Sequence, residues 1–318
     1  MLVLKDSLSL PGDAAKPNED AFAHAEAAAL VMDGATPLGD PLMPGPSDAA
    51  WLAQFGSRRL MAHLKDGETA DEALAAALAE TEKSFAALAR HPVRERWQIP
   101  CASLMLVQLP QARLPLGAKR LEGEVPVAGS APFFGAPAPG ARVASEGRRG
   151  SIEFAWFGDC GALVLRDGAC DIIGEGFDRR AAEAQRARQI AKAQGLAPAP
   201  DLNRPQILAA LRAQRNHVNT GGNWLFSPDP RAAAHVRRQR VEAAPGTLLL
   251  LASDGFLALA TDYGAYDAAG LMAAAQEKGL AALGAELRAI EADDALGERF
   301  ARFKKSDDAT AILLEVAS

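Results

Sequence analysis

Carboxylate side chains recur at the ends of apolar segments in this sequence. The five positions are Glu19-Asp20 before AFAHAE, Asp33 after AAALVM, Asp159 after IEFAWFG, Asp254 after GTLLLLAS, and Asp307-Asp308 before ATAILLEV. Any one of them is most simply explained as a turn, because Asp and Gly favour tight turns. Five together indicate a shared role, since strand ends of one sheet system can converge in space.

Converging carboxylates have a specific chemistry. They repel one another unless protons or cations neutralise them. Oxygen ligands select Mg²⁺ or Mn²⁺ rather than zinc, and the five histidines of the chain show no ligand spacing. Two such ions that share a water molecule lower its pKa and make a hydroxide nucleophile. A phosphate ester is the expected substrate, because the same ions neutralise the charge that develops during its hydrolysis.

Short strands are predicted to position these carboxylates. Period-2 apolar patterns or buried apolar runs bounded by turn residues predict strands within residues 2–13, 17–34 (two strands), 101–109, 151–174 (two or three), 245–256 and 307–316. Tight turns at 158–161 and 167–168 are predicted to join antiparallel strands.

Helices are predicted between these groups of strands. The first two start after Ser47 and Thr69, and Thr69 forms a capping box with Glu72. Residues 178–216 and 266–303 also have helical patterns. This order favours an α+β fold with antiparallel sheet over a doubly wound parallel one.

Two segments are predicted to be irregular. The proline-rich residues 37–47 should form a loop beside Asp33. The Pro/Gly/Ala-rich residues 110–150 are predicted to be an insertion within a single domain of residues 1–318.

The composition excludes several classes of protein. A net charge of −6 and 6% aromatic residues argue against a nucleic-acid partner. Cys101, Cys160 and Cys170 show no CxxC spacing, which argues against disulfides and structural zinc. No apolar run approaches the roughly 20 residues that span a bilayer, and the charged N-terminal segment does not resemble a signal peptide. We expect a cytoplasmic protein with no membrane partner.

Five segments, taken in order, resemble the motifs of the metal-dependent PPM (protein phosphatase 2C-like) Ser/Thr phosphatases. They are NEDAF, VMDGAT, WFGDCGALVLRDG, LLLLASDGF and DDATAILLEV, and the resemblance runs from about residue 7 to residue 318. It implies a four-layer α-β-β-α sandwich with two central antiparallel sheets and a dinuclear Mg²⁺ or Mn²⁺ site at one end. The implied activity is the removal of phosphate from phosphoserine or phosphothreonine proteins by a metal-activated hydroxide.

The resemblance also implies roles for individual residues. The implied metal ligands are Glu19, Asp20, Asp33, Gly34 through its carbonyl, Asp159, Asp254 and Asp307. Asp33 would bridge the two ions, and Asp33 and Asp254 would be the catalytic residues. Asp159 together with Asp254 would serve a third, weaker ion, and Asp308 would support the site structurally.

The sequence departs from the family around the substrate. Where many members have an arginine, this chain has Ala15 followed by Lys16, so Lys16 and Thr36 are the candidate substrate-binding residues. A lysine cannot bind phosphate in the bidentate manner of arginine. Two alternatives therefore stay open, a phosphatase of a small phosphorylated metabolite and an inactive metal-binding regulatory module. Lys304 and Lys305, just before Asp307, are expected to soften the acidic cluster or to steer phosphate.

Overall fold

The structure, a computed structural model, describes residues 1–110, 150–177, 205–300, 302 and 304–318, and its strands form two five-stranded sheets. The first sheet has the order β1 (Leu2–Leu10), β10 (Ala309–Val316), β9 (Leu248–Ala252), β6 (Gly161–Arg166) and β7 (Ala169–Ile173). The second has the order β2 (Asp20–His24), β3 (Ala28–Gly34), β4 (Ala102–Gln108), β5 (Gly150–Phe157) and β8 (Arg237–Ala243). Every neighbouring pair is antiparallel.

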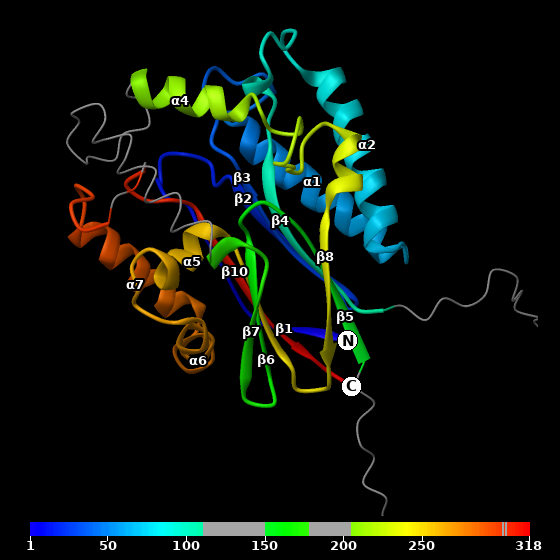
Figure 1. Cartoon of the computed structure of the whole chain (residues 1–318), viewed down its shortest axis with the longest axis vertical. Helices are drawn as coiled ribbons and strands as arrows, with labels where there is room; N and C mark the ends of the chain where they lie inside the picture. Colours follow the sequence, from blue (N-terminus) through cyan, green and yellow to red (C-terminus); the bar gives the residue numbers. More distant parts are fainter. Residues whose placement is uncertain (111–149, 178–204, 301, 303) are drawn as a thin grey trace, which may run out of the picture.

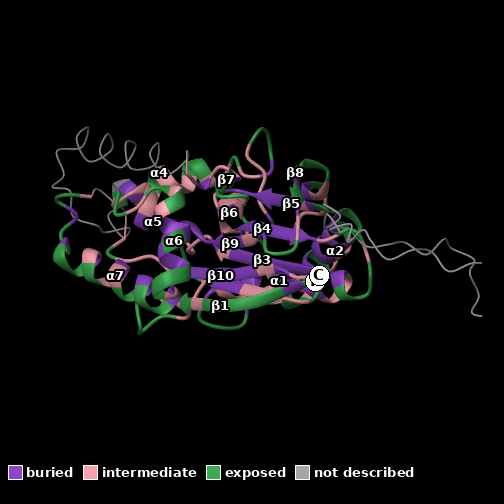
Figure 2. Ribbon diagram, turned by 90° about the horizontal axis from the view of Figure 1, so that it is seen from below, coloured by how far each residue is buried: buried purple, intermediate pink, exposed green. Residues whose placement is uncertain are grey.

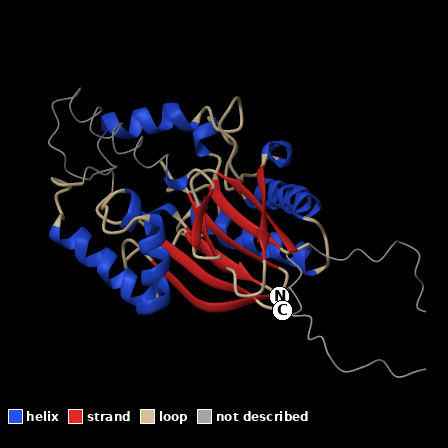
Figure 3. Cartoon of the chain, turned by 60° about the horizontal axis from the view of Figure 1, so that its bottom comes forward, coloured by secondary structure: helices blue, strands red, loops and turns tan. Residues whose placement is uncertain are grey.

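Helices cover the outer faces of both sheets (Figures 1 and 3). The second sheet packs against α1 (Asp48–Lys65) and α2 (Ala70–Leu88), and the first packs against α5 (Asp254–Thr261), α6 (Ala268–Lys278) and α7 (Leu280–Asp293). The remaining helices are α4 (Pro205–Arg215) and the 3-10 helices η1 (Arg96–Gln98) and η2 (Pro230–His235). The predicted four-layer α-β-β-α sandwich is therefore confirmed.

Alternation along β3 shows how the sequence builds these layers. Ala29 and Val31 point between the two sheets, whereas Leu30 and Met32 point toward α1 and α2. Both faces are buried (Figure 2), which explains why the strand reads as a continuous apolar run. Each such side chain contributes about 1.5–3 kcal/mol when fully buried, so the sandwich holds the ends of its strands rigidly.

The local signals for the first two helices are confirmed. Ser47 Oγ accepts from the backbone of Ala50 at the start of α1. Thr69 and Glu72 form the predicted capping box at the start of α2. Both caps satisfy backbone N–H groups that a helix leaves without partners at its first turn.

Several predictions of local structure were wrong. The turn at residues 158–161 does not join paired strands, because β5 pairs with β4 and β8 while β6 pairs with β7 and β9. Residues 158–160 instead cross from one sheet to the other. The predicted helix of residues 266–303 is divided at Gly279, which has a φ of 80°, and its second part ends at Asp293. Strand β8 was not predicted, since its charged sequence RRQR hides the alternation.

Other predictions fall partly outside the described residues. Of the predicted insertion, the structure describes only residues 110 and 150. Of the helical segment predicted at 178–216, it describes residues 205–216, and residues 205–215 form α4. Among the helices that the structure describes, none is long and apolar enough to cross a bilayer.

Candidate metal centre

The strand ends that carry the carboxylates meet at one end of the sandwich. Strand β2 begins at Asp20, which pairs with Asp33 near the end of β3. Strand β9 ends one residue before Ser253-Asp254, and β10, its antiparallel neighbour, begins directly after Asp308. Because antiparallel neighbours run in opposite directions, the end of one lies beside the start of the next. Carboxylates from both sheets therefore share one edge.

Three of the predicted residues come into direct proximity. Carboxylate oxygens of Asp33, Asp159 and Asp254 all lie within 4.8 Å of one another. They come from the end of β3, from the crossing between β5 and β6, and from the first residue of α5. A cluster of three carboxylates at this spacing matches the oxygen ligation that Mg²⁺ and Mn²⁺ prefer.

Burial and the mutual repulsion of these groups both raise the pKa of Asp33. Desolvation raises its pKa well above the usual value, and the charges of Asp20, Asp254, Asp307 and Asp159 raise it further. These four residues therefore lie within electrostatic reach of Asp33. A bound cation would remove the repulsion that now favours the protonated form.

Asp20 is a buried carboxylate that the described protein does not satisfy. Neither of its carboxylate oxygens has a hydrogen-bond partner of ordinary geometry. Burial raises its pKa strongly and the charges of Asp308 and Asp307 add to the rise, while the nearby hydroxyls of Ser253 and Thr310 offset part of it. An unsatisfied buried carboxylate is costly, and it is the kind of group that a cation or an ordered water would complete.

Glu19 is held in place by two hydroxyl groups. Thr36 Oγ1 and Ser47 Oγ each donate to its carboxylate at 2.6 Å. Asp308 in turn accepts from the backbone N–H groups of Glu19 at 2.6 Å and Gly12 at 2.7 Å. Asp308 thus fastens the segment before β2 to the start of β10, in keeping with its expected structural role.

Gly34 allows the backbone to close around the centre. A Cβ atom at this position would lie 2.6 Å from the carbonyl oxygen of Glu19 and 2.7 Å from that of Ala49. Its N–H donates to the carbonyl of Glu19 at 3.0 Å. The close packing, the orphaned oxygens of Asp20 and the oxygen-only donor set together fit a hard divalent cation.

The loop of residues 37–47 is packed against this centre. The Asp48 carboxylate accepts from the backbone N–H groups of Leu42 and Met43, each at 2.8 Å, and both side chains are buried. From α4, Arg212 donates to the carbonyl of Leu38 and Arg215 to that of Thr36. These contacts hold the loop in place beside α1 and α4.

A cavity lies at the end of α4. It has a volume of about 320 Å³, and its lining includes Arg96, Arg215 and Arg231. Cys101 also lines it, and the carbonyl of Cys101 accepts from the N–H of Ala35, two residues after Asp33. The cavity thus adjoins the backbone that carries the carboxylate cluster.

The two predicted substrate-binding residues lie in different surroundings. Thr36 is beside the centre, but its hydroxyl is used to hold Glu19. Lys16 is exposed, and its ammonium makes no hydrogen bond or ion pair with the described residues. The structure brings Thr36, but not the Lys16 side chain, into contact with a predicted ligand.

Two supporting residues were missed by the sequence analysis. Ser103 Oγ donates to Asp159 Oδ1 at 2.6 Å, and Ser103 pairs with Asp33 across β3 and β4. A lone serine in the apolar run CASLMLV was a signal that could have found it. Arg288 of α7 donates to the carbonyl of Asp307 at 2.8 Å. No sequence pattern distinguishes that arginine from others in charged helices.

Comparison with known proteins supports the fold. No family model matches the sequence, and no curated protein matches it. The serine/threonine phosphatase PstP/Ppp of Mycobacterium tuberculosis is similar in structure, with a TM-score of 0.50 and 15% identity over 100% of this chain and 99% of that chain. The PPM Ser-Thr phosphatase MsPP of Mycobacterium smegmatis, solved with cacodylate, has a TM-score of 0.50 and 15% identity over 100% and 98%. The photosystem II phosphatase PBCP has a TM-score of 0.51 and 13% identity over 99% of both chains.

These similarities extend over entire chains at very low identity. The chain therefore has the fold of the PPM Ser/Thr phosphatases. At one end of that fold it has an acidic group that could bind metal.

Proposed function

We propose that this protein is a Mg²⁺- or Mn²⁺-dependent phosphomonoester hydrolase that acts on phosphoserine and phosphothreonine in proteins. The observation that carries the proposal is the convergence of Asp33, Asp159 and Asp254 within 4.8 Å at one end of a PPM-type sandwich. The names of the three similar structures, all phosphatases, support the same class of activity.

The proposed ligand set is the one that the resemblance to the PPM phosphatases implies. Asp33, Asp254 and Asp307 would hold one ion, and Asp33, Glu19 and the carbonyl of Gly34 would hold a second. Asp159 would contribute to a third, weaker site with Asp254, and Asp20 would complete the shell directly or through water. Bound there, the ions would lower the pKa of a water nucleophile and neutralise the charge on the phosphate.

The protein's own residues would orient this centre. Thr36 and Ser47 fix the rotamer of Glu19, and Ser103 fixes that of Asp159. Ser47, the last residue of the 37–47 loop, contacts Glu19, and we propose that this loop bounds the centre on that side. Neither the methyl group of Ala35 nor the hydroxyl of Thr36 can serve as a general acid, so we propose that water protonates the leaving oxygen.

The first experiment is hydrolysis of an aryl phosphate by the purified full chain. We expect activity that requires Mn²⁺ or Mg²⁺ and is lost on addition of a chelator. Asp33→Asn and Asp254→Asn should each abolish it, and Asp167→Asn, at a hairpin turn outside the cluster, should leave it unchanged. A wild-type protein with no activity at any Mn²⁺ concentration would favour an inactive metal-binding module instead.

The substrate class is tested separately. Ala15 takes the place of a phosphate-binding arginine, and this favours a small phosphorylated metabolite as the second candidate substrate. A panel of phosphopeptides and a panel of phosphorylated metabolites should be compared by kcat/KM. Turnover of metabolites alone would contradict the proposed action on proteins while leaving the metal-dependent chemistry intact.

A further inference from the structure

Lys304 places a positive charge against one of the proposed metal ligands. Its Nζ atom donates to Asp307 Oδ1 at 2.6 Å, and the two side chains are only 29% and 28% exposed. Desolvation opposes the charge of the ammonium, but the carboxylates of Asp307, Asp33 and Glu19 outweigh it, so the pKa of Lys304 is raised. The ammonium is therefore positioned among carboxylates that come from both sheets.

The chain on either side of Lys304 is anchored. On one side, Arg302 forms a buried ion pair with Asp294 at 2.7 Å and also donates to the carbonyl of Lys305 at 3.0 Å. On the other side, Arg288 donates to the carbonyl of Asp307 at 2.8 Å. These contacts hold Arg302, Lys305 and Asp307 in place on either side of Lys304, whose side chain lies against Asp307.

This contact has a consequence for cation binding. The Oδ1 atom of Asp307 already accepts two hydrogen bonds, from Lys304 Nζ at 2.6 Å and from the backbone N–H of Asp308 at 3.0 Å. A metal ion that uses this oxygen must compete with these donors, and it must also overcome the repulsion of a nearby positive charge. Lys305, the next residue, is exposed and has no side-chain hydrogen bond or ion pair with the described residues.

We propose that Lys304 is an internal counter-ion that competes with a divalent cation for Asp307 and so sets the metal concentration at which the centre fills. The inference rests on the proposed metal centre. Lys304 neutralises part of the cluster when the metal is absent and is released when the metal binds. By linkage, metal binding and the Lys304–Asp307 contact weaken each other to the same extent.

Calorimetric titration of Mn²⁺ into chelator-treated full-length protein tests this. Lys304→Met removes the charge and keeps most of the apolar stem, and Lys305→Met is the matched control. We expect Lys304→Met to bind Mn²⁺ about fivefold to tenfold more tightly at the site that includes Asp307. Lys305→Met should stay within about twofold of wild type, since an exposed lysine is screened by solvent and salt.

Thermal unfolding separates competition from a structural role. Metal-free Lys304→Met should melt at a lower temperature than wild type, because Asp307 loses its ion pair with Lys304, yet Mn²⁺ should raise its melting temperature by more than it raises that of wild type. If Lys304→Met does not fold, Lys304→Gln provides the same comparison, and Lys304→Arg should resemble wild type.

Each result has one reading. Equal or weaker Mn²⁺ binding by Lys304→Met or Lys304→Gln, with normal binding by wild type, overturns the role of Lys304 alone. If wild type and the Lys304 variants all fail to bind Mn²⁺ at millimolar concentration, the metal centre itself is overturned, and this inference with it.

Discussion

Two Asp-Gly pairs in this chain have the same residues but opposite surroundings. Asp33-Gly34 ends β3, where the Gly34 position is enclosed by the carbonyls of Glu19 and Ala49. Asp167-Gly168 forms the turn between β6 and β7, where both residues have positive φ, 50° and 80°, and nothing lies within 4 Å of a Cβ atom on Gly168. The first glycine is required for close packing, and the second for backbone conformation.

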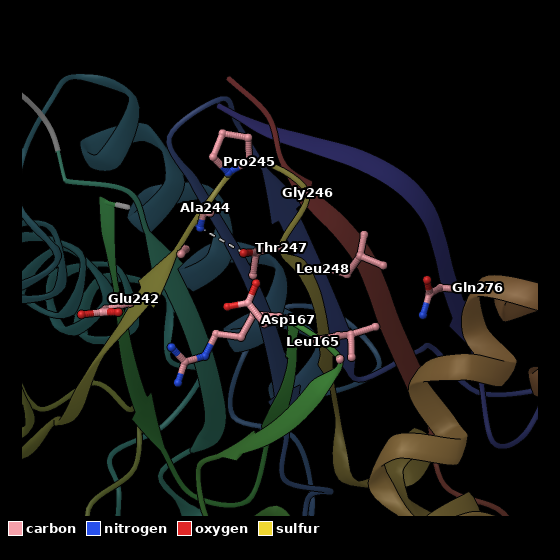
Figure 4. Close-up of a pocket in the computed structure, with 12 residues that line it drawn as sticks. Leu165, Asp167, Glu242, Ala244, Pro245, Gly246, Thr247, Leu248 and Gln276 are labelled. Carbon is pink, nitrogen blue, oxygen red and sulfur yellow. Dashed lines mark hydrogen bonds between the residues drawn. The ribbon is translucent and has the colours of Figure 1, made fainter. Parts of the chain in front are cut away.

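The end of the sandwich that contains Asp167 also has a cavity, and it is larger than the cavity beside Cys101 described above. Its volume is about 360 Å³, and it lies between the β6–β7 turn and the loop from β8 to β9 (Figure 4). Thr247 faces into this loop and accepts from the N–H of Ala244 at 3.1 Å. Strands β6 and β9 run from one end of the molecule to the other, so this cavity and the carboxylate cluster lie at opposite ends.

The comparison shows that cavity size does not identify the proposed functional end. The larger cavity is lined mainly by turn residues, whereas the cluster end gathers carboxylates, Asp20 and Asp33, whose pKa values are raised by burial and by neighbouring charges. Strongly perturbed pKa values combined with convergence indicate a functional site better than volume does.

The largest expected effect is at the cluster end. Asp33→Asn or Asp254→Asn removes a proposed ligand charge, and we expect Mn²⁺-dependent hydrolysis of an aryl phosphate to fall by more than about 100-fold. Asp167→Asn makes the same chemical change at the other end, and Asn also tolerates positive φ. Initial rates over a Mn²⁺ series would check this, and equal losses at the two ends would contradict the assignment.

A smaller effect is expected at Ser103, which touches the cluster only through Asp159. Ser103→Ala removes the 2.6 Å hydrogen bond to Asp159 Oδ1 and so weakens the positioning of that carboxylate. Loss of such a supporting bond typically costs 10- to 100-fold in metal affinity or activity, and we expect about 10-fold. Titration with Mn²⁺ should show the loss in affinity, while the circular dichroism spectrum stays unchanged. An unaltered affinity would show that Asp159 needs no support.

The sequence predicted the composition of the cluster because each carboxylate adjoins an apolar strand. It predicted neither the hydrogen bond of Ser103 to Asp159 nor that of Arg288 to the carbonyl of Asp307, since both contacts depend on which strands and helices pack together. The same limit explains the error at residues 158–161. A Gly-Asp-Cys-Gly turn reads as a hairpin locally, and only the pairing of β5 and β6 with different sheets shows that it crosses between layers.

Asp20 allows a prediction about stability rather than activity. Its pKa is raised by burial above the ordinary value of 3.8, so the unfolded chain loses this proton before the folded one does. The contribution of Asp20 to the free energy of unfolding of the metal-free protein therefore falls as the pH rises above about 3.8. Asp20→Asn should recover about 1–3 kcal/mol at pH 7, and the gain should vanish below the ordinary pKa.

Urea unfolding in the presence of a chelator, at several pH values, measures this difference. Asp167→Asn again provides the control, because its carboxylate is at a turn and not among converging charges. A stabilisation by Asp20→Asn that is equally large at pH 3 and pH 7 would show that its cause is not the ionised carboxylate.

The smallest expected effect concerns Gly168. Gly168→Ala places a side chain at a φ of 80°, which costs about 1 kcal/mol, but the Cβ atom meets nothing within 4 Å. We expect a slightly lower midpoint of urea unfolding with unchanged Mn²⁺ affinity and unchanged hydrolysis. Gly34→Ala, in contrast, forces a Cβ atom against two carbonyl oxygens and should weaken Mn²⁺ binding. If Gly168→Ala also weakened Mn²⁺ binding, the two ends would be coupled through β6, and the separation of a functional end from a structural end would fail.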